Sequence, residues 1–118
     1  MGNSQKLKTG DRLRIIRELI GLTQREFAEF LGVDISKLKN IEYKRNRVTE
    51  EIYEQIGENF PELLKWFVYE GPVDLPELRK SDSKYCKFIA ARFDAGLVPE
   101  EYFSEDLIRD GDFKAQDR

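Results

Sequence analysis

Residues 23–45 read TQREFAEFLGVDISKLKNIEYKR, and this stretch predicts two short helices separated by a tight turn. Helical spacing places Phe27 and Leu31 on one face of the first segment. Leu38 and Ile41, three residues apart, share one face of the second segment. The two apolar faces can pack together, so we expect a pair of helices held against each other across the turn.

The ends of the first segment carry their own signals. Gly32 lies in the turn, where it permits a backbone conformation that costs other residues energy. Thr23 is followed three residues later by Glu26, which is the spacing of a capping box. We therefore expect the first helix to begin just after Thr23 and to end at Gly32.

The second segment has a polar face opposite its buried face. On a helical wheel of about 100° per residue, this face carries Ser36, Lys39, Asn40 and Tyr43, with Ile35 and Lys37 beside it. Hydroxyl, amide and ammonium groups suit base edges and phosphates together. Asn40 could pair with adenine through two hydrogen bonds, and Ile35 could contact a thymine methyl group. The alternative is an ordinary solvated face of an amphipathic helix.

The stretch resembles the Cro and lambda-repressor type of helix-turn-helix regulator, also called the XRE family. The resemblance rests on Leu22, Thr23, Gln24, Ala28, Gly32, Leu38, Ile41 and Glu42, and it extends back to GDRLRIIRELIG at 10–21 and forward to Gly71. It implies an all-α fold: a five-helix lambda-repressor-like DNA-binding domain, here followed by a short helical C-terminal extension. The chain departs from the commoner family pattern at Ile35 and Tyr43, where many members have polar or small residues.

The resemblance also implies roles for individual residues. The base-reading positions of the family fall on Ile35, Ser36 and Asn40, with Lys37 and Lys39 as neighbours. The family's phosphate-gripping glutamine corresponds to Gln24. Its structural ion pair corresponds to Arg17 and Glu42.

Charge is distributed unevenly along the chain. The net charge is -3, which is not typical of a nucleic-acid-binding protein, but residues 1–50 carry +4 and residues 51–118 carry -7. Lys44, Arg45 and Arg47 follow the polar helix directly. We expect them to contact DNA phosphates, although their alternative role is solubility.

The segment at 61–71, PELLKWFVYEG, has more apolar side chains than a helix of that length needs within a small domain. Candidates for a homodimer interface are Leu63, Trp66, Phe67 and Tyr69. Alternatively, the C-terminal extension covers this patch within one chain.

We expect five parts along the chain. These are a flexible arm (1–9), the DNA-binding domain (10–71), an extended connector (72–80), a helical extension for dimerisation or partner docking (81–109) and a disordered tail (110–118). In the extension, Tyr85, Phe88 and Ile89 form one apolar stripe, with Cys86, Ala90 and Phe93 beside it. We expect a further short helix over 99–108. Cys86, between two lysines, could sense oxidants, but its apolar neighbours favour a packed thiol.

Enzymatic activity has little support, because the chain has no histidine and no phosphate-binding glycine loop. We therefore expect no catalytic residue, no metal site and no cofactor. No apolar run approaches the roughly 18 residues needed to span a membrane, and MGNSQK does not resemble a secretory signal. The single cysteine fits a reducing cytoplasm.

These observations predict a transcriptional regulator that binds double-stranded DNA. We expect a repressor that binds a palindromic operator as a homodimer, with a possible protein partner at the C-terminal extension. Two alternatives keep the same fold: an antitoxin-type autorepressor and a protein-binding adaptor.

Overall fold

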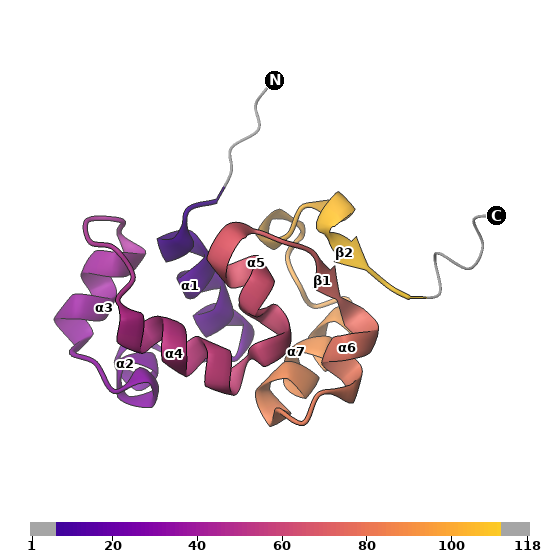
Figure 1. The fold of residues 1–118 in the computed structure, drawn as a ribbon, viewed down its shortest axis with the longest axis horizontal. Helices are drawn as coiled ribbons and strands as arrows, with labels where there is room; N and C mark the ends of the chain where they lie inside the picture. The colour runs from indigo at the N-terminus through magenta and orange to yellow at the C-terminus, as the bar shows by residue number, and fades with distance from the viewer. Residues whose placement is uncertain (1–6, 112–118) are drawn as a thin grey trace, which may run out of the picture. The chain divides into compact units, whose positions relative to one another are not determined.

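The structure is a computed structural model that describes residues 7–111. Within these residues the elements are α1 (Thr9–Leu19), α2 (Gln24–Leu31), α3 (Ile35–Glu42), α4 (Glu50–Asn59), the 3₁₀ turn η1 (Pro61–Leu63), α5 (Leu64–Tyr69), β1 (Val73–Asp74), α6 (Leu75–Lys80), α7 (Lys84–Asp94), the 3₁₀ turns η2 (Glu100–Tyr102) and η3 (Glu105–Leu107), and β2 (Ile108–Arg109) (Figure 1). The fold is all-α, as predicted. Most of the predicted arm and tail, at 1–6 and 112–118, lies outside the described residues.

The chain forms two compact units, 1–53 and 54–118, whose boundary falls within α4. In unit 1, α3 packs against both α1 and α2. The buried core of this unit comprises Leu13, Ile15, Ile16, Leu19, Phe27, Ala28, Leu31, Leu38, Ile41 and Ile52. Ile20 is only half-buried, because α1 ends at Leu19 and Ile20 leaves the apolar face of the helix.

The turn between α2 and α3 has the local geometry that its sequence predicts. The hydroxyl of Thr23 accepts a hydrogen bond from the Glu26 amide at 3.1 Å, and the Glu26 carboxylate accepts one from the Thr23 amide at 2.9 Å. Gly32 has a φ of 73°, in the left-handed region that favours glycine. Capping box and glycine therefore fix where α2 begins and ends.

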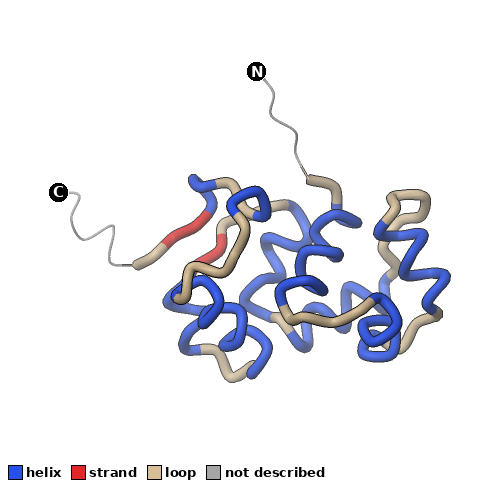
Figure 2. Tube along the Cα trace, turned by 180° about the vertical axis from the view of Figure 1, so that it is seen from behind, coloured by secondary structure: helices blue, strands red, loops and turns tan. Residues whose placement is uncertain are grey.

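Unit 2 joins short helices to a minimal sheet. α6 packs against α7, and β1 pairs in parallel with β2 through the Val73–Ile108 register. Figure 2 shows the two strands side by side in red, with the β2 segment arriving from the C-terminal part of the chain. The strand pair anchors the last described segment of the chain to the residues just after α5.

The prediction of an extended connector at 72–80 is wrong, because this range contains β1 and α6. Pro76 occupies the first turn of α6, where a helix has no use for the missing amide proton. Asp74 caps the same helix by accepting a hydrogen bond from the Glu77 amide at 3.1 Å. Pro76 and Asp74 therefore mark the start of a helix within the predicted connector.

Three of the four candidate dimer-interface residues are buried within the chain. Leu63, Trp66 and Phe67 are fully buried, whereas Tyr69 is 61% exposed. The ring of Trp66 lies 4.6 Å from that of Phe103, which comes from the C-terminal extension. The alternative expectation, that the extension covers this patch within one chain, describes the structure, and the first three residues are not available to a partner.

The first helix of the predicted extension begins three residues after Ser81, and its buried face differs from the predicted apolar stripe. Ser83 caps α7 through its hydroxyl, so the helix begins at Lys84, and its buried face carries Cys86, Ile89 and Ala90. Phe88, expected inside, is 45% exposed. The prediction of a helix over 99–108 is wrong, since this range contains two 3₁₀ turns and the first residue of β2. Burial raises the pKa of the Cys86 thiol to about 11, so the thiol stays protonated at neutral pH, which argues against the oxidant-sensing alternative.

Candidate nucleic-acid interface

Helix α3 presents a continuous polar surface to solvent. Ser36, Lys37 and Lys39 are exposed, while Ile35 and Asn40 are half-buried. Leu38 and Ile41 lie in the core on the opposite side. The five residues predicted to read bases therefore share one side of α3, and the three exposed ones are the most accessible.

A buried ion pair holds α3 in place. Arg17 Nε donates to Glu42 Oε2 at 2.8 Å, and Arg17 Nη2 donates to Glu42 Oε1 at 2.9 Å. The Glu42 side chain is 1% exposed and that of Arg17 is 13% exposed. Gln24 Nε2 also donates to Glu42 Oε1, at 3.0 Å. Because these residues come from α1, α3 and α2 in turn, one carboxylate links all three helices.

Gln24 was predicted to grip a phosphate, and its amide is partly engaged in this network. A side-chain amide nitrogen has two donor hydrogens, so one donor remains beyond the bond to Glu42. The residue also opens α2, where unpaired backbone amides and the helix dipole favour an anion. The geometry of Gln24 is therefore compatible with a phosphate contact.

The loop after α3 folds back on the end of the helix. The amides of Arg45 and Asn46 both donate to the carbonyl oxygen of Asn40, at 2.8 and 3.2 Å. Lys44 takes a left-handed backbone conformation, with a φ of 65°. The Arg45 guanidinium lies over the Tyr43 ring, 5.6 Å from its centroid. These contacts order the basic loop against α3 before any ligand is present.

Between this loop and the start of α1 lies a hollow of about 660 Å³, which we call the basic hollow. Its described lining contains no carboxylate and four cations, which are Lys8, Lys44, Arg45 and Arg47. The uncharged lining residues are Thr9, Gly10, Ile41, Asn46, Val48 and Tyr53. A concave surface of this charge suits a phosphate group. Sequence reasoning placed three of these cations at phosphates and assigned Lys8 to the arm.

Lys44 is not free in this hollow. Its Nζ donates to Asp11 Oδ1 at 2.9 Å, while Asp11 Oδ2 accepts a hydrogen bond from the Lys8 amide at 3.0 Å. Burial by itself would raise the pKa of Asp11, but the hydrogen bonds from Lys44 and from the Lys8 amide hold this pKa below its usual value. Sequence reasoning missed Asp11 as a partner, although an acidic residue in the first turn of a helix is a visible signal.

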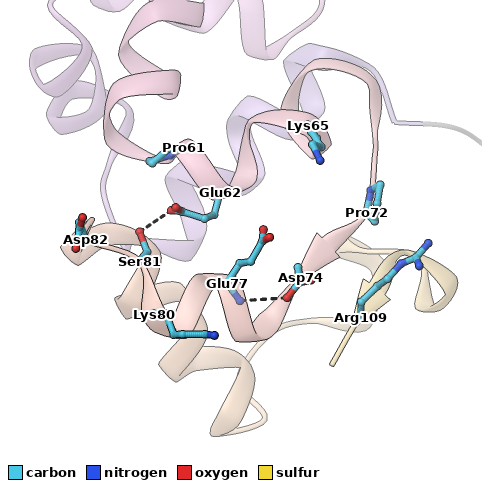
Figure 3. A pocket seen from close by; sticks show the side chains of 10 residues that line it. All are labelled: Pro61, Glu62, Lys65, Pro72, Asp74, Glu77, Lys80, Ser81, Asp82 and Arg109. Atoms are coloured by element: carbon cyan, nitrogen blue, oxygen red, sulfur yellow. Dashed lines mark hydrogen bonds between the residues drawn. The ribbon is translucent and has the colours of Figure 1, made fainter. Parts of the chain in front are cut away.

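Unit 2 has a hollow of a different character (Figure 3). Its volume is about 640 Å³, and its charged lining residues are Glu62, Lys65, Asp74, Glu77, Lys80, Asp82 and Arg109. The Asp74 carboxylate accepts a hydrogen bond from the Glu77 amide, and the Glu62 carboxylate accepts one from the Ser81 hydroxyl, as the dashed lines in Figure 3 show. Mixed charge and internal pairing give this hollow no preference for an anion such as phosphate.

Comparison with known proteins identifies the DNA-binding part. Residues 13–67 match a family model described as helix-turn-helix. No curated protein and no solved structure matches the chain. No helix within residues 7–111 combines the length and apolar character needed to cross a bilayer. The matched region contains Arg17, Glu42 and the polar surface of α3, so residues 13–67 belong to the Cro and lambda-repressor type helix-turn-helix family of DNA-binding transcriptional regulators.

Proposed function

We propose that this protein is a repressor that binds a palindromic double-stranded operator as a homodimer. Helix α3 would enter the major groove, where Ser36, Lys37, Lys39 and Asn40 read base edges and Ile35 adds apolar contact. Gln24, Lys44, Arg45 and Arg47 would contact phosphates on either side of the groove.

One observation carries this proposal: the exposed polar surface of α3 is followed directly by the loop that lines the basic hollow, and Asn40 accepts a hydrogen bond from Arg45 of that loop at 3.5 Å, so base-reading and phosphate-binding groups are adjacent. The side chains of Lys37, Lys39 and Arg47 make no hydrogen bond or ion pair with another described residue. Because α3 is already held by Arg17 and Glu42, its two lysines can meet DNA without prior rearrangement of the helix.

The dimer and the repressor role are argued from operator symmetry and from the size of the protein. A two-fold dimer would read two half-sites about one helical turn apart. A small dimer over a promoter would exclude polymerase without any further surface, which favours repression over activation. Of the original interface candidates, Tyr69 remains exposed, next to the exposed Val68.

Salt dependence tests DNA binding directly. We expect the full chain to retard a random-sequence duplex at low salt, with a log–log salt slope of about 0.9 per phosphate contacted. Selection of bound duplexes from a random pool should then yield a palindrome. If no duplex is retarded at low salt, the protein-binding adaptor becomes the better explanation of the same fold.

Two single substitutions separate base reading from phosphate binding. Ser36→Ala should relax preference at one base position, whereas Arg47→Met should weaken all sequences alike and lower the salt slope by about 0.9. Ser36 is preferable to Asn40 for this test, because Asn40 accepts from the Arg45 guanidinium at 3.5 Å and its loss would disturb both groups. Lys80→Met, an exposed cation of unit 2, is the matched control. Equal uniform losses in Ser36→Ala and Arg47→Met would contradict this division of roles.

Light scattering on the intact chain tests the dimer. The intact chain is the right sample, because removing the extension would take Phe103 from Trp66 and expose an artificial apolar surface. Tyr69→Glu should shift a dimer towards monomer, since it places a charge in the proposed interface. A wild-type chain that is monomeric at tens of micromolar, alone and with its selected duplex, would overturn the two-half-site arrangement.

A further inference from the structure

We propose that Asp11 competes with the DNA backbone for Lys44, and so restrains the sequence-independent part of DNA binding. This inference rests on the proposed DNA-binding function and assigns a role to a carboxylate that the function does not otherwise use. The Lys44 amine, which a phosphate would take, is already held by Asp11 at 2.9 Å.

The geometry makes the competition direct. Asp11 uses one carboxylate oxygen to cap the amide of Lys8 and offers the other to Lys44, so its position is fixed by the start of α1. Its side chain is 15% exposed, whereas that of Lys44 is 45% exposed. The carboxylate is therefore a stationary partner, and the lysine is the member of the pair that can move.

The backbone on both sides of the pair leaves little freedom. A Cβ atom at Gly10 would overlap the carbonyl oxygen of Ile41, so the start of α1 and the end of α3 are in close contact. Lys44 itself has a left-handed φ of 65°, which sets the direction of its side chain towards α1. The pair is thus a consequence of how α1 meets α3, and it forms without DNA.

A phosphate entering the basic hollow meets Lys8, Arg45 and Arg47, but it must share the Lys44 ammonium with Asp11, whose carboxylate already offsets the charge of that lysine. Because phosphate contacts are the same for every sequence, this competition lowers affinity for all DNA. Base contacts from α3 then contribute a larger share of the total binding free energy. Asp11 is a positioning residue in this role, because it acts on DNA through Lys44.

The experiment measures binding of a random-sequence duplex by the full chain across a salt titration. Asp11→Asn should keep the Lys8 cap, because an amide oxygen still accepts, while it releases Lys44. We expect roughly tenfold tighter binding, the scale of one charge-assisted hydrogen bond, and a salt slope steeper by about 0.9. Glu50→Gln removes one exposed carboxylate elsewhere in unit 1 and should change the affinity less than about twofold, as for a screened surface charge.

The decisive comparison repeats Asp11→Asn in the Lys44→Met background. If Asp11 acts through Lys44, its removal there should improve binding by no more than about twofold, because a remaining exposed charge effect is screened. An equal gain in both backgrounds would show that Asp11 is only a bulk negative charge and would overturn the inference. The inference would also be overturned if the wild-type chain binds DNA and Asp11→Asn leaves its affinity unchanged. Failure of every variant to bind would overturn the proposed function itself, which is a different pattern.

Discussion

The two units of this protein use charged and aromatic side chains in opposite ways. Unit 1 buries an ion pair, Arg17 with Glu42, and leaves the cations Lys37 and Lys39 unpaired on its surface. In unit 2, by contrast, Arg79 pairs on the surface with Asp94 and Asp110, while tilted aromatic rings, Trp66 against Phe103, close the interior. The lysines of α3 are therefore available to a ligand, whereas the Arg79 guanidinium is already paired.

This contrast has a physical cause. A buried bidentate pair has fixed geometry and few alternatives, so it can orient α3, whereas an exposed pair is screened by water and orients little. Aromatic rings bury large apolar areas without needing charged partners. Unit 1 therefore adds a polar contact that orients α3 to its packed apolar core, whereas unit 2 closes its interior with aromatic packing.

The strongest test of the contrast is removal of the buried arginine. Arg17→Met should lower the free energy of unfolding by about 4 kcal/mol, because it leaves the carboxylate of Glu42 buried without its cation. Urea denaturation followed by circular dichroism measures the loss. Arg14→Met is the control, since Arg14 pairs with Glu18 at the surface and should cost about 0.5 kcal/mol or less. Similar losses in the two variants would break the distinction between buried and exposed pairs.

The aromatic closure of unit 2 is the second test. Phe103 contacts Trp66 at 4.6 Å and Phe93 at 5.2 Å between ring centroids. Phe103→Ala should cost about 3 kcal/mol, at the lower end for a buried phenylalanine because the side chain lies near the surface. Trp66 is the one tryptophan of the chain, so its fluorescence should shift to the red as water reaches the ring. Phe88→Ala, at an exposed ring, should change neither quantity appreciably, and an equal effect there would contradict the closure.

The sequence predicted unit 1 much better than unit 2, and the reason lies in how local the signals are. Thr23, Glu26 and Gly32 determine the bounds of α2 through contacts within a few residues. The apolar spacing of Leu38 and Ile41 likewise identifies the buried face of α3 without knowledge of the rest. Such patterns remain visible in one dimension, and the family resemblance added the long-range pair of Arg17 with Glu42.

Unit 2 depended on contacts between distant residues. An excess of apolar side chains around Trp66 was visible, but Phe103, which covers it, lies 37 residues further on, and its role followed only from the packed chain. The predicted connector at 72–80 contains Pro76, and a proline can start a helix as well as exclude one. At the candidate interface, the polar surface of α3 was predictable, whereas the ion pair of Asp11 with Lys44 depends on how α1 meets α3.

Two glycine substitutions compare the units through smaller expected changes in stability. Gly10→Ala would press a methyl group against the carbonyl oxygen of Ile41 and should destabilise the protein by about 2 kcal/mol, as overpacking does. Gly57→Ala is the matched change in unit 2, where the new methyl group would meet the Leu64 side chain at an ordinary 3.6 Å. That change should stabilise helix α4 by about 0.5 kcal/mol. Thermal melts of both variants decide the matter, and a loss at Gly57 as large as that at Gly10 would contradict the close contact of α1 with α3.

Loss of the exposed ion pairs of Arg79 should have the smallest effect on stability. The pH dependence of this effect shows whether it comes from the ion pairs. The hydrogen bond from Arg79 lowers the pKa of Asp94 below its ordinary value of 3.8. A carboxyl whose pKa is lowered by folding adds stability above that ordinary value and loses it as pH falls through the folded pKa. Arg79→Met should therefore lower the urea midpoint slightly at neutral pH, and this deficit should shrink in acid as the pH falls through the lowered pKa of Asp94 and the pair is lost. Lys80→Met, at an exposed cation without a partner among the described residues, should have no effect at either pH. A deficit in Arg79→Met that persists in acid would mean that the arginine stabilises unit 2 through its aliphatic stem, and surface charge would then matter less in this unit than its ion pairs suggest.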